Sequence, residues 1–306
     1  MIELAPAWDG YYDPDERQDI QLAINVNTVT VDGNDLRVRV YEQHGDAPTV
    51  LVAHGLLGYG LVFARFHLPF WRRGWRVVQF DLPGCGESGG PRGAATVQDI
   101  MAAWLGIVAW AARTYGAPVF AMGNAEDGVV SYYALANHPS VGALSVHTLF
   151  EYGDPADPGW VQPPWAVRVV RVALGLLARN RPRTTLPGSW TIPFKHVFAG
   201  PDDADYRRRL KADPLALQRG GAPLGYSLVK RFSPPVKFED CATPVQVIIS
   251  TRSRLWRADA IRRSAERLGG PREIVEIDEP HWEMSREFHD MYSEHVMRWF
   301  DQVRDA

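Results

Sequence analysis

Cysteine is scarce in this chain: its 306 residues include only Cys85 and Cys241, and a single possible bridge cannot be inferred from sequence. Long apolar runs are missing too, since none approaches the roughly 18 residues that a membrane span needs. The first ten residues, MIELAPAWDG, lack the basic and apolar regions of a signal peptide. We therefore expect a soluble, reduced, cytoplasmic protein with no stable membrane insertion.

An excess of charge of one sign is also absent. The chain holds 33 Lys and Arg against 36 Asp and Glu, so its net charge is −3. A value this close to neutral does not suggest nucleic acid or an anionic membrane as the partner. No group of His, Cys, Asp and Glu has the spacing of metal ligands, and no cofactor is implied.

The composition that remains is that of an ordinary globular protein, with 46% hydrophobic and 23% charged residues. The length suits one large α/β domain with an insertion, or two small domains. Tryptophan is frequent, with eleven residues. Trp160, Trp165 and Trp190 fall within residues 151–240 and hint at a large apolar pocket there, although ordinary packing explains them equally well.

Hydrophobic patterning predicts strands that alternate with helices, and therefore a parallel sheet covered on both faces. Residues 1–20 are expected to form a loose lead-in. A hairpin is expected at 23–31 and 36–42, around Asp32-Gly33-Asn34-Asp35. Further strands are predicted at 49–53, 75–80, 119–122, 143–150, 245–249 and 274–277, and helices at 61–73, 96–115, 165–178, 203–211, 258–268 and 287–303. The alternation breaks between residues 151 and 240, which predicts an inserted, mostly helical cap.

Residues 118–137, PVFAMGNAEDGVVSYYALAN, predict a strand, a very tight turn and a helix. Other motifs stand in order around this turn. They are His54-Gly55-Leu56-Leu57-Gly58, then Asp81-x-x-Gly84-x-Gly86-x-Ser88, then Gly123-x-Ala125, and finally Pro280-His281.

This order resembles the α/β-hydrolase fold over nearly the whole chain after residue 23. The stretch RLKADPL at residues 209–215 is similar to the serine aminopeptidase and monoacylglycerol lipase-like branch. The resemblance implies a doubly wound, mostly parallel α/β sheet with an inserted helical cap. We expect residues 1–152 and 241–306 to form the core and 153–240 to form the cap, or lid.

The resemblance also implies where the chemistry lies. The turn would be a nucleophile elbow with its nucleophile at position 125, and the backbone N–H groups of Leu56 and Glu126 would form the oxyanion hole. We expect the side chain of His54 to be structural, and Ser88 to be a turn residue. His281, after a strand and before the last helix, occupies the position of the family's general base.

The acid that orients the histidine departs from the family pattern, because Ser253 stands where an Asp is usual. We predict Glu151, directly after the strand at 143–150, as this acid, with Asp154 and Asp259 as alternatives; Glu151 could also merely open the cap. Asp127 stands where the elbow's second glycine would be, and we expect it to cap the following helix.

Ala125 has no atom that can attack a substrate. The interpretation we adopt is that it replaces a native serine, in a serine hydrolase or acyltransferase acting on an ester, thioester or amide with a sizeable apolar part. Two others stay open: a non-catalytic ligand-binding relative, and a member of the fold whose His281 works without a nucleophile. The expected partner is a small-molecule acyl substrate; the sequence determines neither its identity nor the oligomeric state.

Overall fold

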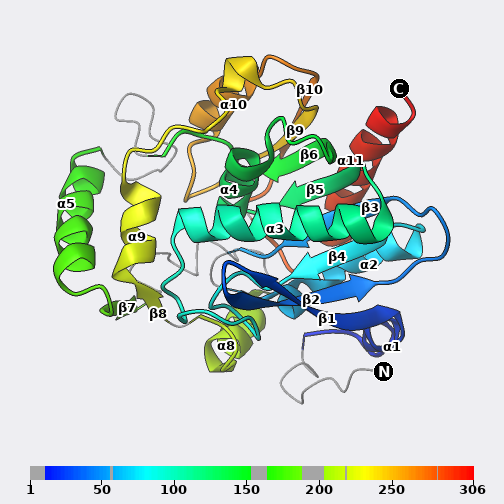
Figure 1. Cartoon of the computed structure of the whole chain (residues 1–306), viewed down its shortest axis with the longest axis horizontal. Helices are drawn as coiled ribbons and strands as arrows, with labels where there is room; N and C mark the ends of the chain where they lie inside the picture. The colour runs from blue at the N-terminus through cyan, green and yellow to red at the C-terminus, as the bar shows by residue number, and fades with distance from the viewer. Residues whose placement is uncertain (1–10, 56–57, 153–163, 188–202, 218, 281) are drawn as a thin grey trace.

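The computed structural model describes residues 11–55, 58–152, 164–187, 203–217, 219–280 and 282–306. Its centre is a twisted eight-stranded sheet in the order β1-β2-β4-β3-β5-β6-β9-β10 (Figure 1). The strands are β1 Ile24–Val31, β2 Asn34–Tyr41, β3 Thr49–Ala53, β4 Arg76–Phe80, β5 Val119–Gly123, β6 Val141–His147, β9 Val245–Ser250 and β10 Arg272–Ile277. The strands from β4 to β10 run parallel, whereas β2 is antiparallel to both β1 and β4.

The inner strands are short and buried along their whole length, which is why their sequences are continuous apolar runs. The β1–β2 hairpin turns at Asp32 and Gly33, both with positive φ, as a two-residue turn that matches the strand twist requires. The predicted hairpin, its turn and the parallel arrangement are confirmed.

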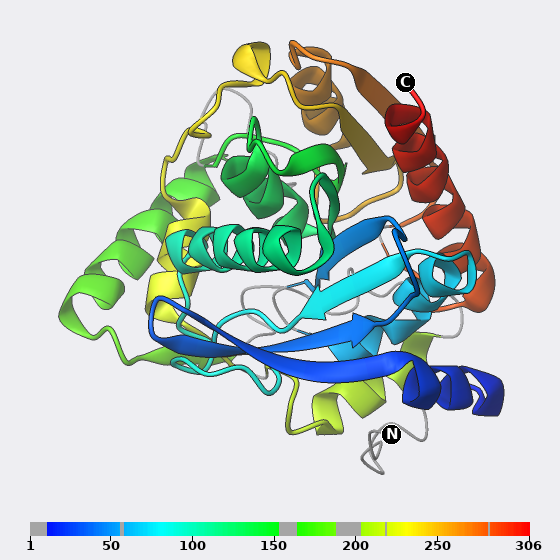
Figure 2. The ribbon, with the colours of Figure 1, turned by 45° about the vertical axis from the view of Figure 1, so that its right-hand side comes forward.

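Helices cover both faces of the sheet (Figures 1 and 2). One apolar cluster joins the sheet to helices such as α3, α4 and α10, and the other joins it to α1, α2, α8 and α11. The helices are α1 Pro14–Ala23, α2 Ala64–Arg72, α3 Val97–Tyr115, α4 Glu126–Leu135, α5 Pro164–Asn180, α8 Asp203–Ala212, α9 Ala222–Val229, α10 Ala258–Glu266 and α11 Arg286–Arg304. Short 3-10 helices lie at Gly60–Phe63 and Phe238–Asp240.

Two helices were not predicted, and both ends of one strand were misplaced. The expected loose lead-in contains α1, which begins with a capping box between Asp13 and Glu16 and with Pro14 in its first turn. Helix α9 contains Pro223 and Gly225, which hide its helical pattern. Strand β6 begins earlier than predicted, at Val141, and ends at His147 rather than at residue 150.

The chain between β6 and β9 holds α5, α8, α9 and a small two-stranded sheet of β7 Thr185–Pro187 and β8 Arg219–Gly221. Its start and end meet at one point, where Tyr152 and Phe232 form an antiparallel bridge. The hydroxyl of Tyr133, from α4, donates to the carbonyls of Phe150 and Phe232 and accepts from the N–H of Tyr152. The exact bounds of this inserted segment, which the sequence places at residues 153 and 240, stay a prediction.

Candidate active site

Ala125 lies between β5 and α4 in a strained backbone conformation, with φ 53° and ψ −130°. A residue other than glycine rarely adopts positive φ, and the conformation costs on the order of 1–3 kcal/mol unless the surrounding structure imposes it. An alanine gains nothing locally from this strain. The backbone therefore has the sharp strand-to-helix turn that lifts a nucleophile above the sheet, although the side chain is only a methyl group.

Two glycines make the tight turn possible. A Cβ at Gly123 would lie 2.1 Å from the Ser131 hydroxyl, and a Cβ at Gly128 would lie 2.9 Å from the backbone oxygen of His147 in β6. Gly128, one position later than in the family motif, thus allows the close approach of α4 to the sheet.

The turn at Ala125 lies against the end of β3 in the described part of the chain. A Cβ built on Gly55 would lie 3.9 Å from the Cβ of Ala125, so the end of β3 faces position 125. The amides of Asp127 and Gly128 bond to the carbonyls of Asn124 and Ala125. The N–H of Glu126 makes no hydrogen bond to any residue that the structure describes. Leu56, the other predicted donor, lies outside the described residues.

His54 is structural, as predicted. Its Nδ1–H donates to the carbonyl of Gly55 at 2.8 Å, and its Nε2 accepts from the N–H of Leu82 at 3.0 Å. Burial lowers the pKa of this imidazole, which keeps it neutral and fixes that tautomer. Ser88 is also a turn residue: its hydroxyl donates to the carbonyl of Asp81 and accepts from the N–H of Arg37.

The predicted general base, His281, lies outside the described residues, but both flanks of its loop are defined. Trp282 is buried and stacks on Phe66 of α2, with ring centroids 5.2 Å apart. Its ring also lies 5.4 Å from the ring of His147, at the end of β6. His147 is in turn 2.9 Å from the hydroxyl of Ser250, at the end of β9. The loop that carries position 281 is therefore anchored at the carboxyl ends of these two strands.

The predicted acid is held by an arginine. The carboxylate of Glu151 lies 3.9 Å from the guanidinium of Arg267, which also bonds to Glu239. Glu151 is partly buried, at the carboxyl side of β6, and its role as the orienting acid stays a prediction. Of the alternatives, Asp154 lies outside the described residues, and Asp259 on α10 is bonded to Arg257 and Arg263, which lower its pKa.

Ser253, at the usual position of the acid, accepts hydrogen bonds from the N–H groups of Leu255 and Trp256. The hydroxyl stabilises a local turn in the loop after β9. The family position of the acid is thus occupied by a side chain with a backbone-capping role.

Two buried carboxyls follow Ala125. Burial is the main reason that the pKa of Glu126 is raised to about 8; the Tyr152 hydroxyl opposes this shift and the neighbouring Asp127 adds to it. Burial likewise raises the pKa of Asp127 to about 8. A hydrogen bond from the indole N–H of Trp104, at 2.9 Å, opposes this shift. Our prediction that Asp127 caps α4 is wrong: Ala125 is the N-cap residue, and Asp127 points to α3. Both carboxyls are mainly protonated at pH 7.

Three aspartates that the motifs did not single out as functional hold the loops around the site. Asp81 accepts from the N–H of Gly60 at 2.7 Å and pairs with the buried guanidinium of Arg39 at 3.1 Å. Asp213, just after α8, accepts from the Tyr59 hydroxyl at 2.6 Å, next to the oxyanion loop. Asp203, the first residue of α8, accepts from the N–H of Met284, next to the loop of position 281. Helix α8 therefore braces both loops.

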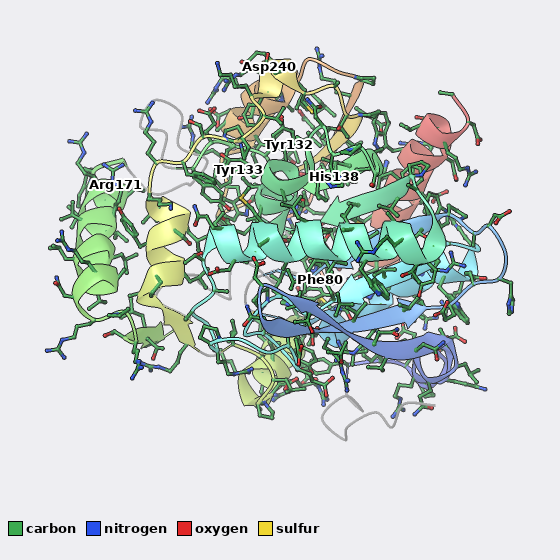
Figure 3. The ribbon with its side chains drawn as sticks, viewed as in Figure 1. Phe80, Tyr132, Tyr133, His138, Arg171 and Asp240 are labelled. Carbon is green, nitrogen blue, oxygen red and sulfur yellow. The ribbon has the colours of Figure 1, made fainter. Side chains whose placement is uncertain are left out.

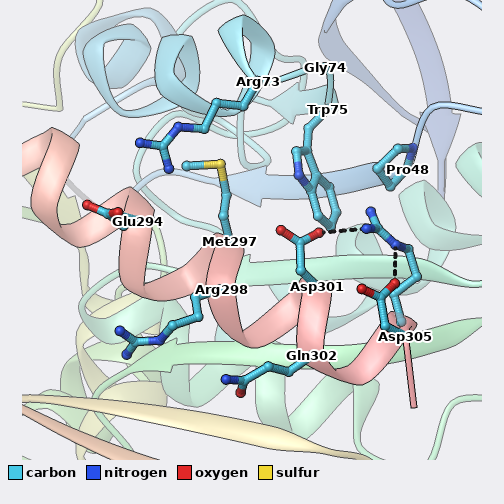
Figure 4. A pocket seen from close by; sticks show the side chains of 11 residues that line it. Pro48, Arg73, Gly74, Trp75, Glu294, Met297, Arg298, Asp301, Gln302 and Asp305 are labelled. Carbon is cyan, nitrogen blue, oxygen red and sulfur yellow. Dashed lines mark hydrogen bonds and ion pairs between the residues drawn. The ribbon is translucent and has the colours of Figure 1, made fainter.

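A cavity of about 800 Å³ elsewhere is not part of this site. It is lined by Pro48 and Trp75, which precede β3 and β4, and by α11 residues such as Met297 and Asp301 (Figure 4). The amino ends of parallel strands lie at the opposite edge of the sheet from the elbow, which follows β5.

The strand order, the helices on both faces and the strained turn after β5 define an α/β hydrolase. Residues 46–282 match the serine aminopeptidase S33 family, and the chain belongs to that family. The predicted resemblance and fold class are thus confirmed. No protein of curated function matches the chain in sequence.

Solved structures agree on the fold. Similar ones include DcsB in complex with its substrate analogue (16% identity, TM-score 0.73, covering 92% of this chain and 98% of DcsB). A soluble variant of monoglyceride lipase from Saccharomyces cerevisiae, with a substrate analogue, is 13% identical with a TM-score of 0.73 over 92% and 96% of the chains. The monoacylglycerol lipase of Paleococcus ferrophilus is 21% identical, with a TM-score of 0.66 over 86% and 99%. At these identities the likeness shows the fold alone.

Proposed function

We propose that the site serves hydrolysis or acyl transfer on an ester, thioester or amide with a sizeable apolar part, through a nucleophile at position 125. The observation that carries the proposal is the strained conformation of Ala125. Binding alone does not need an elbow at that position, whereas a nucleophile must be presented above the sheet with a backbone donor beside it. The lipase names of several structural relatives agree with an acyl substrate.

In this mechanism a serine at position 125 attacks the acyl carbon, and His281 takes its proton and returns it to the leaving group. The N–H groups of Leu56 and Glu126 bind the oxyanion of the tetrahedral intermediate. The absence of a partner for the Glu126 N–H among the described residues supports this role. Glu151 orients His281, which Ser253 cannot do because a hydroxyl carries no charge to stabilise the imidazolium.

The chain as it stands has no hydroxyl at position 125, so we infer that it is an inactive form of this site. Residues 153–240 are assigned as the cap that shapes the acyl pocket. Whether water or another acceptor resolves the acyl-enzyme decides between hydrolase and acyltransferase. The cytoplasmic location remains a prediction from the sequence; none of the described helices is long and apolar enough to cross a membrane.

The proposal is tested with A125S and p-nitrophenyl esters of increasing acyl length. We expect turnover by A125S at least about 1,000-fold above that of the parent chain, since nucleophile, base and oxyanion donors act as a unit. The matched control is S131A, which removes a hydroxyl of α4 that bonds only to the Gly128 carbonyl in the described structure. No turnover by folded A125S with any ester would contradict the proposal and favour a ligand-binding protein.

The acid is tested separately in the A125S background. We expect E151Q to lower kcat by about 10⁴-fold, the loss found when a catalytic histidine loses its orienting carboxylate. D259N, which removes a carboxylate on α10, should leave kcat within about twofold. The reverse result would assign the role to Asp259.

A further inference from the structure

The outward face of α5 carries a stripe of exposed apolar side chains. Trp165, Val169, Val172 and Leu176 recur at the spacing i, i+4, i+7 and i+11, which places them on one face of a helix. Trp165 is 71% exposed and Val172 is 58% exposed, while Leu174 on the opposite side is buried against α9. Five of the seven large hydrophobic residues that are exposed in the described structure belong to this helix.

The high exposure of Trp165 corrects its interpretation as part of an apolar pocket. Trp160 and Trp190 lie outside the described residues. A contiguous apolar stripe of three helical turns is larger than the scattered apolar residues of an ordinary surface. Helix α5 is the outermost element on its side of the molecule (Figure 1). Such a face marks a candidate interaction surface.

The charge beside the stripe indicates which partner. Arg168 and Arg179 are exposed next to it on the helix, and Arg171 lies further round (Figure 3). Residues 164–187 contain five arginines and no acidic residue. The net charge of −3 for the whole chain conceals this local excess of positive charge.

We propose that this face of α5 is a docking surface for an anionic lipid bilayer, with the helix lying in the plane of the interface. An apolar stripe with a terminal tryptophan and flanking arginines is the pattern of interfacial helices, which bury the apolar face and pair the cations with lipid headgroups. A second copy of the chain fits less well, because a two-fold contact through this face would bring arginines against arginines. The docking extends beyond the proposed chemistry and does not depend on it.

The test uses the full chain and sedimentation with vesicles of phosphatidylcholine alone or with 30% phosphatidylglycerol. We expect binding to the anionic vesicles that weakens as salt rises. The double variant V169D/V172D should bind at least about tenfold more weakly, because two apolar contacts become charged. R168E/R179E should lose at least about tenfold on anionic vesicles.

The matched controls are L22D and R113E. Leu22 on α1 is 65% exposed, and Arg113 is an exposed residue of α3. Both variants should bind like the parent chain. The proposal is overturned if the parent chain binds neither vesicle, or if L22D weakens binding as much as V169D/V172D. It is equally overturned if V169D/V172D instead converts a dimer to a monomer and the parent ignores lipid.

Discussion

Two parts of Glu126 bear on the proposed chemistry. Its backbone N–H is the proposed oxyanion donor, while its side chain is buried beside Tyr152 with a pKa raised to about 8. A protonated carboxyl at this point adds no negative charge next to a developing oxyanion. Burial keeps this carboxyl neutral, so that it would not repel a negative charge bound by the backbone N–H.

The raised pKa makes a prediction about stability. The folded state keeps the Glu126 proton up to about pH 8, whereas the unfolded state loses it near pH 4.5. The free energy of unfolding should therefore fall as pH rises between these values and level off above about 8. In E126Q this contribution disappears, so the stability of the variant relative to the parent chain should rise by about 3–4 kcal/mol from pH 5 to pH 8.

Urea unfolding at pH 5, 6.5 and 8 measures this difference. E266Q, at an exposed position of α10, is the control and should differ from the parent chain by a constant amount at all three pH values. A constant difference for E126Q as well would show that the carboxyl is ionised in the folded protein throughout this range.

For single residues, the sequence motifs located position 125 because strand, glycine and helix signals converge there. They could not assign Asp127, since a carboxylate in the first turn of a helix resembles a cap whether it bonds to the backbone or to Trp104. They also could not find Asp81, Asp203 or Asp213 as bracing residues, because their partners are up to 154 positions away. Spacing in the sequence carries no signal for such contacts.

Helix α8 and the residue after it link the two loops that are proposed to carry the chemistry. Y59F tests this link, because it leaves the buried Asp213 without the donor at 2.6 Å. We expect a loss of about 1–3 kcal/mol in the free energy of unfolding. In the A125S background kcat should also fall by about tenfold, because the oxyanion loop is held less rigidly.

Y115F is the matched control for Y59F. The Tyr115 hydroxyl makes a long contact of 3.4 Å with Glu42 in a partly exposed position, so its loss should change the free energy of unfolding by less than about 0.5 kcal/mol. If Y59F behaves like Y115F in both stability and kcat, α8 does not brace the oxyanion loop.

The packing of α4 on the sheet leads to a separate prediction. G128A places a Cβ 2.9 Å from backbone atoms of β6, which cannot move as a side-chain end can. We expect it to lower the free energy of unfolding by about 1–3 kcal/mol. G220A, where the Cβ would meet nothing within 4 Å, should change it by less than about 1 kcal/mol. Equal effects in thermal or urea unfolding would mean that the elbow has room to relax.

Element prediction succeeded where local and tertiary signals agree. Buried strands such as β3 and β5 were located because their apolar runs end at glycine or histidine turns. Helix α1 was missed although Asp13, Pro14 and Glu16 form a recognisable start, since the helix has few apolar residues and its acidic residues resemble a loose terminus. Helix α9 could not be found because its stability comes from packing on α5 rather than from helix propensity.

At the scale of the whole molecule, four motifs in order were enough to predict the fold, because each marks the end of a parallel strand and the fold fixes the order of those ends. The same motifs do not determine the substrate, whose choice we assign to the proposed cap at residues 153–240, where the chain departs from strand–helix alternation. The outward face of α5 could not be inferred either, since an amphipathic helix shows its stripe in sequence but not which way the stripe points.

Position 125 is, in our proposal, the nucleophile position of an acyl-transfer site. Its most direct test is the mass of A125S after reaction with a fluorophosphonate, followed by peptide mapping. We expect one adduct, on the serine introduced at position 125, which is absent from the parent chain and forms far more slowly in A125S/H281A. An unmodified A125S, or an adduct elsewhere that the parent chain forms equally fast, would contradict it.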